Sequence, residues 1–325
     1  MKGTEFKRAR AGLHLTIIGA ESLGVRSLCC LITLSDRRIV IDPGISLGYS
    51  RHGLMPHPLQ VAVGRTIRKR IVNALATATD IVFSHFHGDH IPLADANPYQ
   101  LSIEDLPKRA RKLPCWSKLE ESPSAEMRRR FMDLTKVFGG NLRVAEGASE
   151  GPLAFSRAVS HGAPQSRLGT VMMTRVESGG RVFVHASDIQ LLDDCAVDRI
   201  LAWHPTVVLA AGPPLYLARL GEASRKRAWN NAIRLAQNVH VVILDHHVMR
   251  NAQGVEWLNK VSAAVGKRVY CVADFMGRPK RLLEMKRTQL YAEMPVPSGW
   301  HARYAVGETS IQAYFDPESV KLLHC

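Results

Sequence analysis

One seven-residue segment constrains this chain more than any other. The apolar, β-branched run 81–83 is typical of a short buried strand, and it leads at once into Ser-His-Phe-His-Gly-Asp-His at 84–90. Three imidazoles and one carboxylate therefore leave a strand end within a single loop. Packing alone does not explain this crowding, because burying polar groups without partners is costly. Imidazole nitrogen and carboxylate oxygen are good zinc ligands, so we predict a metal site formed by His85, His87, Asp89 and His90.

The loop resembles the signature motif of the metallo-β-lactamase superfamily, and the resemblance covers most of the chain, from about residue 14 to about 272. It implies three further ligands in a fixed order: a histidine, an aspartate and a last histidine, each near the end of a strand. His161, Asp188 and His246 occupy these places. Asp42, in the run Ile-Val-Ile-Asp-Pro-Gly, resembles the family residue that supports the ligands without binding the metal.

The resemblance implies two divalent metal ions. In the family pattern the ligands form two groups that share one aspartate: His85, His87 and His161 on one ion, Asp89, His90 and His246 on the other, and Asp188 bridging both. Zinc is the default because imidazole-rich sites suit it, with manganese or iron as alternatives. A bound ion lowers the pKa of water to about 7, so a hydroxide shared by two ions would be available at neutral pH. Asp89 would orient this nucleophile and transfer its proton.

Within the superfamily the chain resembles a group of uncharacterised archaeal-type members, through Glu-Ser-Leu-Gly-Val-Arg-Ser at 21–27 and Arg-Leu-Gly at 167–169. The run Leu-Asp-His-His-Val-Met-Arg at 244–250 is also similar to the last motif of ribonuclease Z, which gives the ligand position to His246. His247 remains a rival because the two are neighbours. Flavodiiron-type members have a glutamate where this chain has His87, so the histidine favours hydrolysis over redox chemistry.

The resemblance implies an α/β fold, the four-layer αβ/βα sandwich of the metallo-β-lactamase type, as a single domain over 1–325. We expect the basic segment 92–140 to be an insertion that covers the site, and the tail from 279 to be irregular. Hydrophobic patterns and turn signals predict the individual elements. The expected strands are 13–18, 27–33, 38–41, 81–83, 142–144, 154–159, 170–176, 181–185, 207–211, 240–244 and 268–272, with a hairpin over 300–314; the expected helices are 67–77, 123–137, 189–200, 222–237 and 255–265.

The formal net charge of +14 attracts anions over long distances. Basic clusters lie at 7–10, 65–70, 108–112, 128–130 and 225–227, and each taken singly is typical of a solvated surface. Aromatic residues make up 6% of the chain and do not interleave with the basic runs, so the stacking signature of single-strand binding is missing. The charge therefore indicates an anionic substrate, with nucleic acid as one candidate.

Cysteine use and hydropathy bear on the compartment. None of the six cysteines forms a Cys-x-x-Cys pair, which argues against a structural zinc knot and for free thiols in a reducing compartment. The sequence contains no run of 18 or more apolar residues, so it predicts no membrane span and we expect no membrane partner. We therefore expect a cytoplasmic protein and leave its oligomeric state open.

The favoured hypothesis is a metal-dependent hydrolase that acts on a phosphodiester, in a nucleotide or a nucleic acid. One alternative is a hydrolase of a small ester, thioester or lactone, for which the charge is incidental. Another is a non-catalytic nucleic-acid-binding protein with a structural metal site. Two arginines, Arg167 and Arg250, are candidates for contact with an anionic substrate, and His185 is either a pocket residue or a buried, hydrogen-bonded one.

Overall fold

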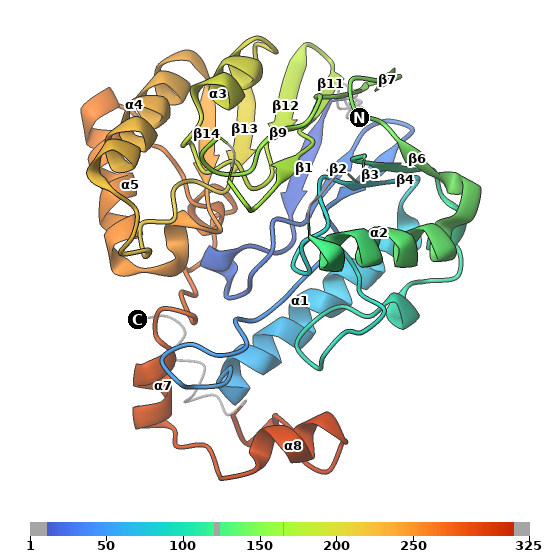
Figure 1. Cartoon of the computed structure of the whole chain (residues 1–325), viewed down its shortest axis with the longest axis vertical. Coiled ribbons are helices and arrows are strands. Elements are labelled where there is room, and N and C mark those ends of the chain that lie inside the picture. Colours follow the sequence, from blue (N-terminus) through green and yellow to red (C-terminus); the bar gives the residue numbers. More distant parts are fainter. Residues whose placement is uncertain (1–11, 120–123, 165, 315–325) are drawn as a thin grey trace, which may run out of the picture.

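Two six-stranded sheets stack face to face, and helices cover the outer face of each (Figure 1). The computed structural model describes residues 12–119, 124–164 and 166–314. In the first sheet, Ile39, Ile41 and Val82 pack into the core between the sheets, whereas Val40 and Phe83 pack into the core under the outer helices. This alternation follows from the pleat of each strand. The predicted four-layer αβ/βα sandwich is confirmed.

The first sheet has the order β1-β2-β3-β4-β5-β6. Its first three strands pair antiparallel, and β3 to β6 run parallel. The elements of this half are β1 (His14–Ile17), β2 (Cys30–Thr33), β3 (Arg38–Ile41), β4 (Asp80–Phe83), β5 (Cys115–Ser117) and β6 (Leu142–Val144), with α1 (Pro58–Thr77) and α2 (Ala125–Phe138).

The second sheet has the order β14-β13-β12-β11-β8-β7, and β12, β13 and β14 run parallel. None of the helices in the described part of the chain has the length and apolar character needed to cross a membrane. The elements of this half are β7 (Ser149–Glu150), β8 (Leu153–Phe155), the separate pair β9 (Val159–Ser160) and β10 (Thr170–Val171), β11 (Thr174–Ser178), β12 (Arg181–His185), β13 (Val207–Ala210), β14 (Val241–Leu244), α3 (Asp194–Leu201), α4 (Glu222–Asn238) and α5 (Ala252–Val265).

Capping explains where two helices depart from the expected bounds. The helix expected from 67 already begins at Pro58, because His57 and Gln60 form a capping box and proline suits the first helical position. The helix expected from 189 begins only at Asp194, because the carboxylate of Asp193 accepts the Cys195 N–H and caps it there. Residues 189–193 consequently form a loop between Asp188 and the start of α3.

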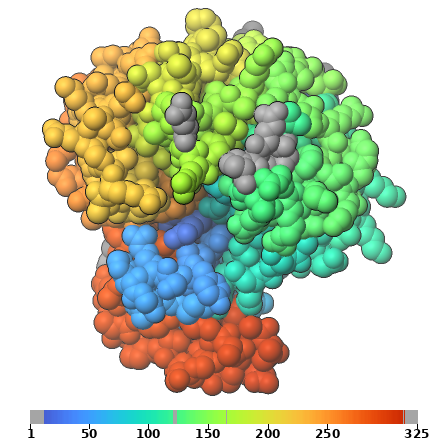
Figure 2. Space-filling view, viewed as in Figure 1, coloured from blue at the N-terminus to red at the C-terminus, as the bar shows by residue number. Residues whose placement is uncertain are grey.

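The C-terminal predictions need correction. The expected strand 268–272 forms only an isolated bridge, at Tyr270, before α6 (Val272–Phe275) begins. The expected hairpin at 300–314 is wrong, because α8 (Trp300–Ala305) stacks Trp300 on Tyr304 at helical spacing. Together with α7 (Arg287–Glu293), α8 gives regular structure to a tail that we expected to be irregular, and Figure 2 shows this tail at one end of the molecule.

The segment 92–140 is built into the first half of the sandwich. It supplies β5, which lies between β4 and β6, and α2, whose Leu134 and Phe138 pack into the same outer core as Phe83. One side chain of α2 also reaches the histidine-rich loop, where Arg130 Nη1 donates to the Phe86 carbonyl at 3.3 Å. The segment therefore packs against the first sheet and touches the loop from its outer side.

Candidate metal centre

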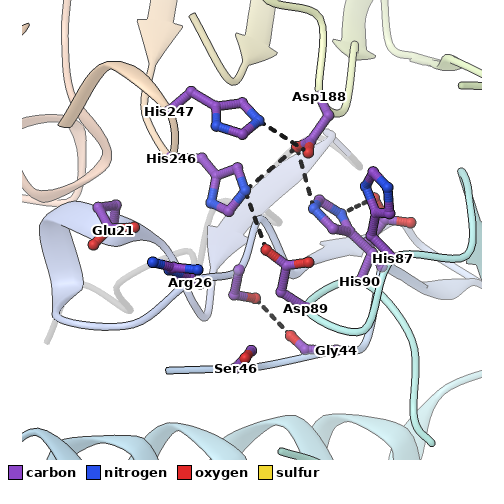
Figure 3. A network of polar contacts seen from close by, with 12 residues as sticks. Glu21, Arg26, Gly44, Ser46, His87, Asp89, His90, Asp188, His246 and His247 are labelled. Carbon is purple, nitrogen blue, oxygen red and sulfur yellow. Dashed lines mark hydrogen bonds and ion pairs between the residues drawn. The ribbon is translucent and has the colours of Figure 1, made fainter. Parts of the chain in front are cut away.

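Loops that follow strands of both sheets converge at one place. Parallel strands present their carboxyl ends at the same edge of a sheet, and the loops after β3, β4, β12 and β14 carry the polar residues of the site. His161 comes from the loop after β9. In Figure 3 Asp188 approaches from one side, while Asp89 and His90 approach from the loop opposite. Residues that are far apart in sequence thus meet because two strand edges face each other.

The structure brings all seven predicted ligands together. Asp188 lies at the centre, with its carboxylate oxygens 3.0 Å from His161 Nε2 and 3.1 Å from His90 Nε2. Among the described residues, the atoms that could ligate a metal ion form four groups, within each of which all atoms lie 4.8 Å or less apart. Two of the groups are His85, His87, His161 and Asp188, and Asp89, His90 and His246; the other two are Asp42, His85 and His90, and Asp188, His246 and His247. The first two groups have the composition that the resemblance implied, and the group with His247 keeps that residue as a rival of His246 for the last ligand position.

Neighbouring histidines His246 and His247 both face Asp188 (Figure 3). His246 Nε2 lies 3.3 Å from Asp89 Oδ2 and 3.7 Å from Asp188 Oδ1, which places it in the group with Asp89 and His90. His247 Nε2 lies 3.3 Å from Asp188 Oδ2, and its Nδ1 is 3.4 Å from the Tyr216 hydroxyl. The backbone around His246 is held by Asp245, whose buried carboxylate accepts the His246 N–H.

Residues behind the cluster hold the histidine rings in place. Asp42 Oδ2 accepts from His90 Nδ1 at 2.9 Å and from the Ser84 hydroxyl at 2.6 Å. On the other side, Gln190 Nε2 lies 3.3 Å from His161 Nδ1. In both rings the bond at Nδ1 leaves Nε2 directed at Asp188, which is how partners behind a metal site usually orient histidine ligands. Asp42 occupies the supporting place that the resemblance gave it.

Orphaned polar atoms show that the cluster fits a cation. Within the described chain, His90 Nε2, Asp188 Oδ1 and His247 Nε2 are buried and have no hydrogen-bond partner. The first two are 3.1 Å apart, yet their orientation does not make a hydrogen bond. Leaving such atoms unsatisfied is costly, and coordination of a divalent ion would satisfy them. The mixture of imidazole nitrogen and carboxylate oxygen suits zinc, manganese or iron.

Burial and neighbouring charges set the protonation states of the groups in the cluster. Burial lowers the pKa of His85 well below its usual value, and the neighbouring rings of His90 and His87 lower it further. Neutral imidazole is the form that binds metal. Burial alone would raise the pKa of Asp188, but the surrounding histidines, His90 and His246 foremost, lower that pKa well below its usual value. His90 behaves differently: burial lowers its pKa, but the Asp188 carboxylate beside it raises that pKa well above its usual value. The cluster therefore offers a neutral ring at His85 and an ionised carboxylate at Asp188, while the proton of His90 would be released when a metal ion binds.

Three residues at the strand ends of the site have a left-handed backbone although none is glycine. Asp42, Ser187 and His246 have φ angles of 50°, 51° and 68°. Side chains other than glycine adopt this region at a cost, and such strain is common at functional sites. Each of the three comes just after β3, β12 or β14, at the point where the chain leaves its sheet. Asp42 and His246 themselves face the cluster, and the turns at Ser187 and His246 also bring the next residues, Asp188 and His247, to it.

A buried arginine adjoins the cluster. Arg250 Nη2 lies 2.8 Å from His246 Nε2 and 3.9 Å from Asp89 Oδ2. Its Nε donates to Glu21 at 3.2 Å and its Nη1 to the Tyr216 hydroxyl at 3.0 Å. Burial raises the pKa of Glu21 to about 7, although Arg250 opposes this shift. Sequence reasoning missed Glu21 and Tyr216, although Glu21 stands in the 21–27 run that carries the archaeal-type resemblance.

Two other candidates lie outside the cluster. His185 is fully buried, and its Nε2 lies 3.0 Å from the Leu28 carbonyl, which makes it a hydrogen-bonded core residue rather than a pocket residue. Arg167 is exposed and, unlike Arg250, makes no hydrogen bond or ion pair with the residues around Asp188 in the part of the chain that the structure describes.

Comparison with known proteins identifies relatives of this chain. No family model matches it. A UPF0282 protein of Methanosarcina mazei is 44% identical over 302 residues, which cover 93% of this chain and 99% of that relative. The chain belongs to the UPF0282 family. A second member of the family, from Thermococcus gammatolerans, is 31% identical over 284 residues, which cover 84% of this chain and 93% of that protein.

Solved structures show weaker similarity. A metal-dependent hydrolase of the β-lactamase superfamily has a TM-score of 0.48 and 11% identity, over 80% of this chain and 96% of that chain. AidC, a dizinc quorum-quenching lactonase, has a TM-score of 0.31 and 15% identity, over 49% of this chain and 55% of that chain. Neither similarity is close enough to carry an argument about the site.

Proposed function

We propose that this UPF0282 protein is a metal-dependent hydrolase whose substrate is a phosphodiester, in a nucleotide or a nucleic acid. The observation that carries the proposal is the convergence of seven ligand-type side chains, from loops of both sheets, on the Asp188 carboxylate. The resemblance to the metallo-β-lactamase signature supports the assignment of His85, His87 and His161 to one ion and Asp89, His90 and His246 to the other. Zinc is the default ion, because imidazole ligands predominate.

The bound ions would supply Lewis acidity and a nucleophile at neutral pH. The other tasks fall to side chains of the chain itself. Asp89 is placed to orient the nucleophile and take its proton, since its carboxylate faces the cluster beside His246. Asp42 keeps the His90 ring oriented through its 2.9 Å hydrogen bond. Gln190 does the same for His161.

Positive charge supports an anionic substrate. Arg250 brings a guanidinium within 3.9 Å of Asp89, and its position between Glu21 and Tyr216 fixes its direction. Guanidinium groups bind phosphate oxygens strongly because their N–H donors match the anion's geometry. The net charge of +14 would draw such a substrate toward the protein. The likeness of 244–250 to the last ribonuclease Z motif points to the same substrate class.

Turnover of bis-p-nitrophenyl phosphate by zinc-loaded protein tests the proposal. We expect activity that His87→Ala abolishes and that His240→Ala retains, because His240 is an exposed histidine outside the cluster. Hydrolysis of a lactone, thioester or simple ester without phosphodiesterase activity would overturn the substrate assignment. Tight, salt-dependent oligonucleotide binding without cleavage by metal-loaded protein would overturn the enzyme assignment.

The role of Arg250 has its own test. Arg250→Ala should raise KM for the anionic phosphodiester about tenfold, because a charge-assisted hydrogen bond of about 1.5 kcal/mol is lost. Arg250→Lys should recover part of this loss, since the charge remains. A fall in kcat with unchanged KM would instead show that Arg250 only positions His246.

A further inference from the structure

A cavity outside the candidate metal centre gathers arginines from distant parts of the chain. It has a volume of about 200 Å³ and is lined by Arg70 on α1 and by Arg278 and Arg281 in the segment after α6. Leu23, Ile67 and Pro279 complete its wall. A neighbouring hollow of about 370 Å³ shares Arg70 and Arg278. We call the first cavity, with its three arginines, the arginine pocket; none of the proposed metal ligands lines it.

The guanidinium groups of the arginine pocket have no acidic partner. Among residues 12–119, 124–164 and 166–314, no ion pair or side-chain hydrogen bond involves Arg70, Arg278 or Arg281. Asp274, a carboxylate close to this segment in sequence, is already bound by Arg268 at 3.0 Å and Lys280 at 2.7 Å. Arg70 and Arg278 are exposed and Arg281 is half-buried, whereas the buried Arg250 is paired with Glu21. The pocket therefore holds positive charge that no acidic side chain in the described part of the chain compensates.

The fold holds these arginines near one another despite their repulsion. The backbone N–H of Arg278 donates to the Ala273 carbonyl at 2.8 Å, and that of Arg281 donates to the Ser22 carbonyl at 2.8 Å. Arg70 is fixed by its place within α1. Burial lowers the pKa of Arg70, and the like charges of Arg278 and Arg281 lower it further. An anion in the pocket would relieve this repulsion.

Geometry and chemistry favour phosphate as that anion. Each guanidinium offers a planar fork of N–H donors that matches two phosphate oxygens, and several such forks around one cavity can bind all sides of the group. Leu23 and Ile67 are buried and give the pocket an apolar floor, so water reaches a bound anion only from the open side. We propose that the arginine pocket binds a phosphate group, either free or as one phosphate of a phosphodiester chain. This site is independent of the function proposed for the metal centre.

The test compares matched charge removals in the full-length, zinc-loaded protein. Arg70→Ala/Arg278→Ala removes two charges from the pocket, whereas Arg181→Ala/Arg199→Ala removes two exposed arginines elsewhere. Thermal unfolding is followed with increasing inorganic phosphate or pyrophosphate at constant ionic strength. We expect phosphate to raise the melting temperature of wild type and control alike, and the pocket variant to bind at least tenfold more weakly. Equal responses of pocket variant and control would overturn the proposal.

A second readout does not depend on ligand. Because Arg70 and Arg278 repel each other, the pocket variant should be at least as stable as wild type in low salt without phosphate, and a clear loss of stability would overturn the argument from repulsion. Fluorescence anisotropy with a labelled single-stranded oligonucleotide then identifies the source of the phosphate. Competition between oligonucleotide and phosphate for the pocket supports the proposal with a phosphodiester chain as ligand, and protection by phosphate alone supports it with the free anion.

Discussion

Gly44 lies against the histidine-rich loop with no room for a side chain. A Cβ at this position would lie 2.2 Å from Ile91 N, 2.3 Å from His90 C and 2.5 Å from His90 N. Figure 3 shows Gly44 close to Asp89, and its carbonyl accepts the Ser27 hydroxyl at 2.7 Å. The backbone of Gly44 is not in the left-handed region, so alanine could adopt it. The effect of Gly44→Ala therefore comes from the collision alone.

The size of this effect follows from the distances. The His90–Ile91 backbone must move by roughly 1 Å to restore ordinary van der Waals contact. Overpacking of this kind costs about 3 kcal/mol of unfolding free energy. Because His90 is a proposed ligand, a shift of that size should also lower turnover by about 100-fold. Gly44→Ala should thus lose both stability and zinc affinity.

Gly64→Ala is the matched control. Gly64 lies inside α1, and its new Cβ would meet Leu47 Cδ1 at 3.5 Å, an ordinary contact. Alanine should stabilise the helix by about 1 kcal/mol. Urea unfolding of both variants in chelator, followed by zinc titration, measures the two effects separately. Wild-type stability and zinc affinity in Gly44→Ala would refute the steric reasoning.

Three further predictions concern metal, core and acid. Zinc at 100 times its Kd should raise the unfolding free energy by about 2.7 kcal/mol, and His87→Ala should lose most of this gain in calorimetry. His185→Ala should cost about 3 kcal/mol, because it opens a cavity and orphans the Leu28 carbonyl, while metal content measured by mass spectrometry stays at the wild-type level. Burial raises the pKa of Asp80, but hydrogen bonds, that of Arg37 foremost, bring it below its usual value. The ionised form therefore stabilises the fold above about pH 4, and this contribution is lost as the pH falls through the lowered pKa. The difference in unfolding free energy between wild type and Asp80→Asn should consequently be largest at pH 7 and shrink in acid. A difference that stays unchanged down to pH 2 would contradict this.

The resemblance to the metallo-β-lactamase signature implied the sandwich, whereas local patterns predicted where the cluster lies, because its residues directly follow strands that are easy to recognise. Short β-branched runs end directly before the 84–90 loop and before His246, so the strand and its functional loop are visible together. The start of α2 is also a local feature, since the hydroxyl of Ser124 accepts the Met127 N–H and caps the helix. Where a sequence pattern and the feature that it indicates lie in the same short segment, the sequence was enough to predict the feature.

The misses depend on contacts between distant segments. Arg287 is fully buried in the tail, bound to Glu284 at 2.7 Å and to the Leu54 carbonyl at 3.0 Å, and nothing in the residues around it indicates that burial. Glu21 and Arg250 are 229 positions apart, so their ion pair is not visible in any local pattern. The start of α1 was a different failure, because proline at the first helical position was a signal that we did not use.

At the three strand ends with a left-handed backbone, thermal stability and metal binding favour different residues. Asparagine or glycine would adopt the backbone of Asp42, Ser187 or His246 at less cost than the residues present. A screen for heat resistance should therefore enrich replacements at these positions. Each replacement would delete a carboxylate, hydroxyl or imidazole that faces the cluster. Variants that gain thermal stability through these positions should therefore bind metal more weakly than wild type.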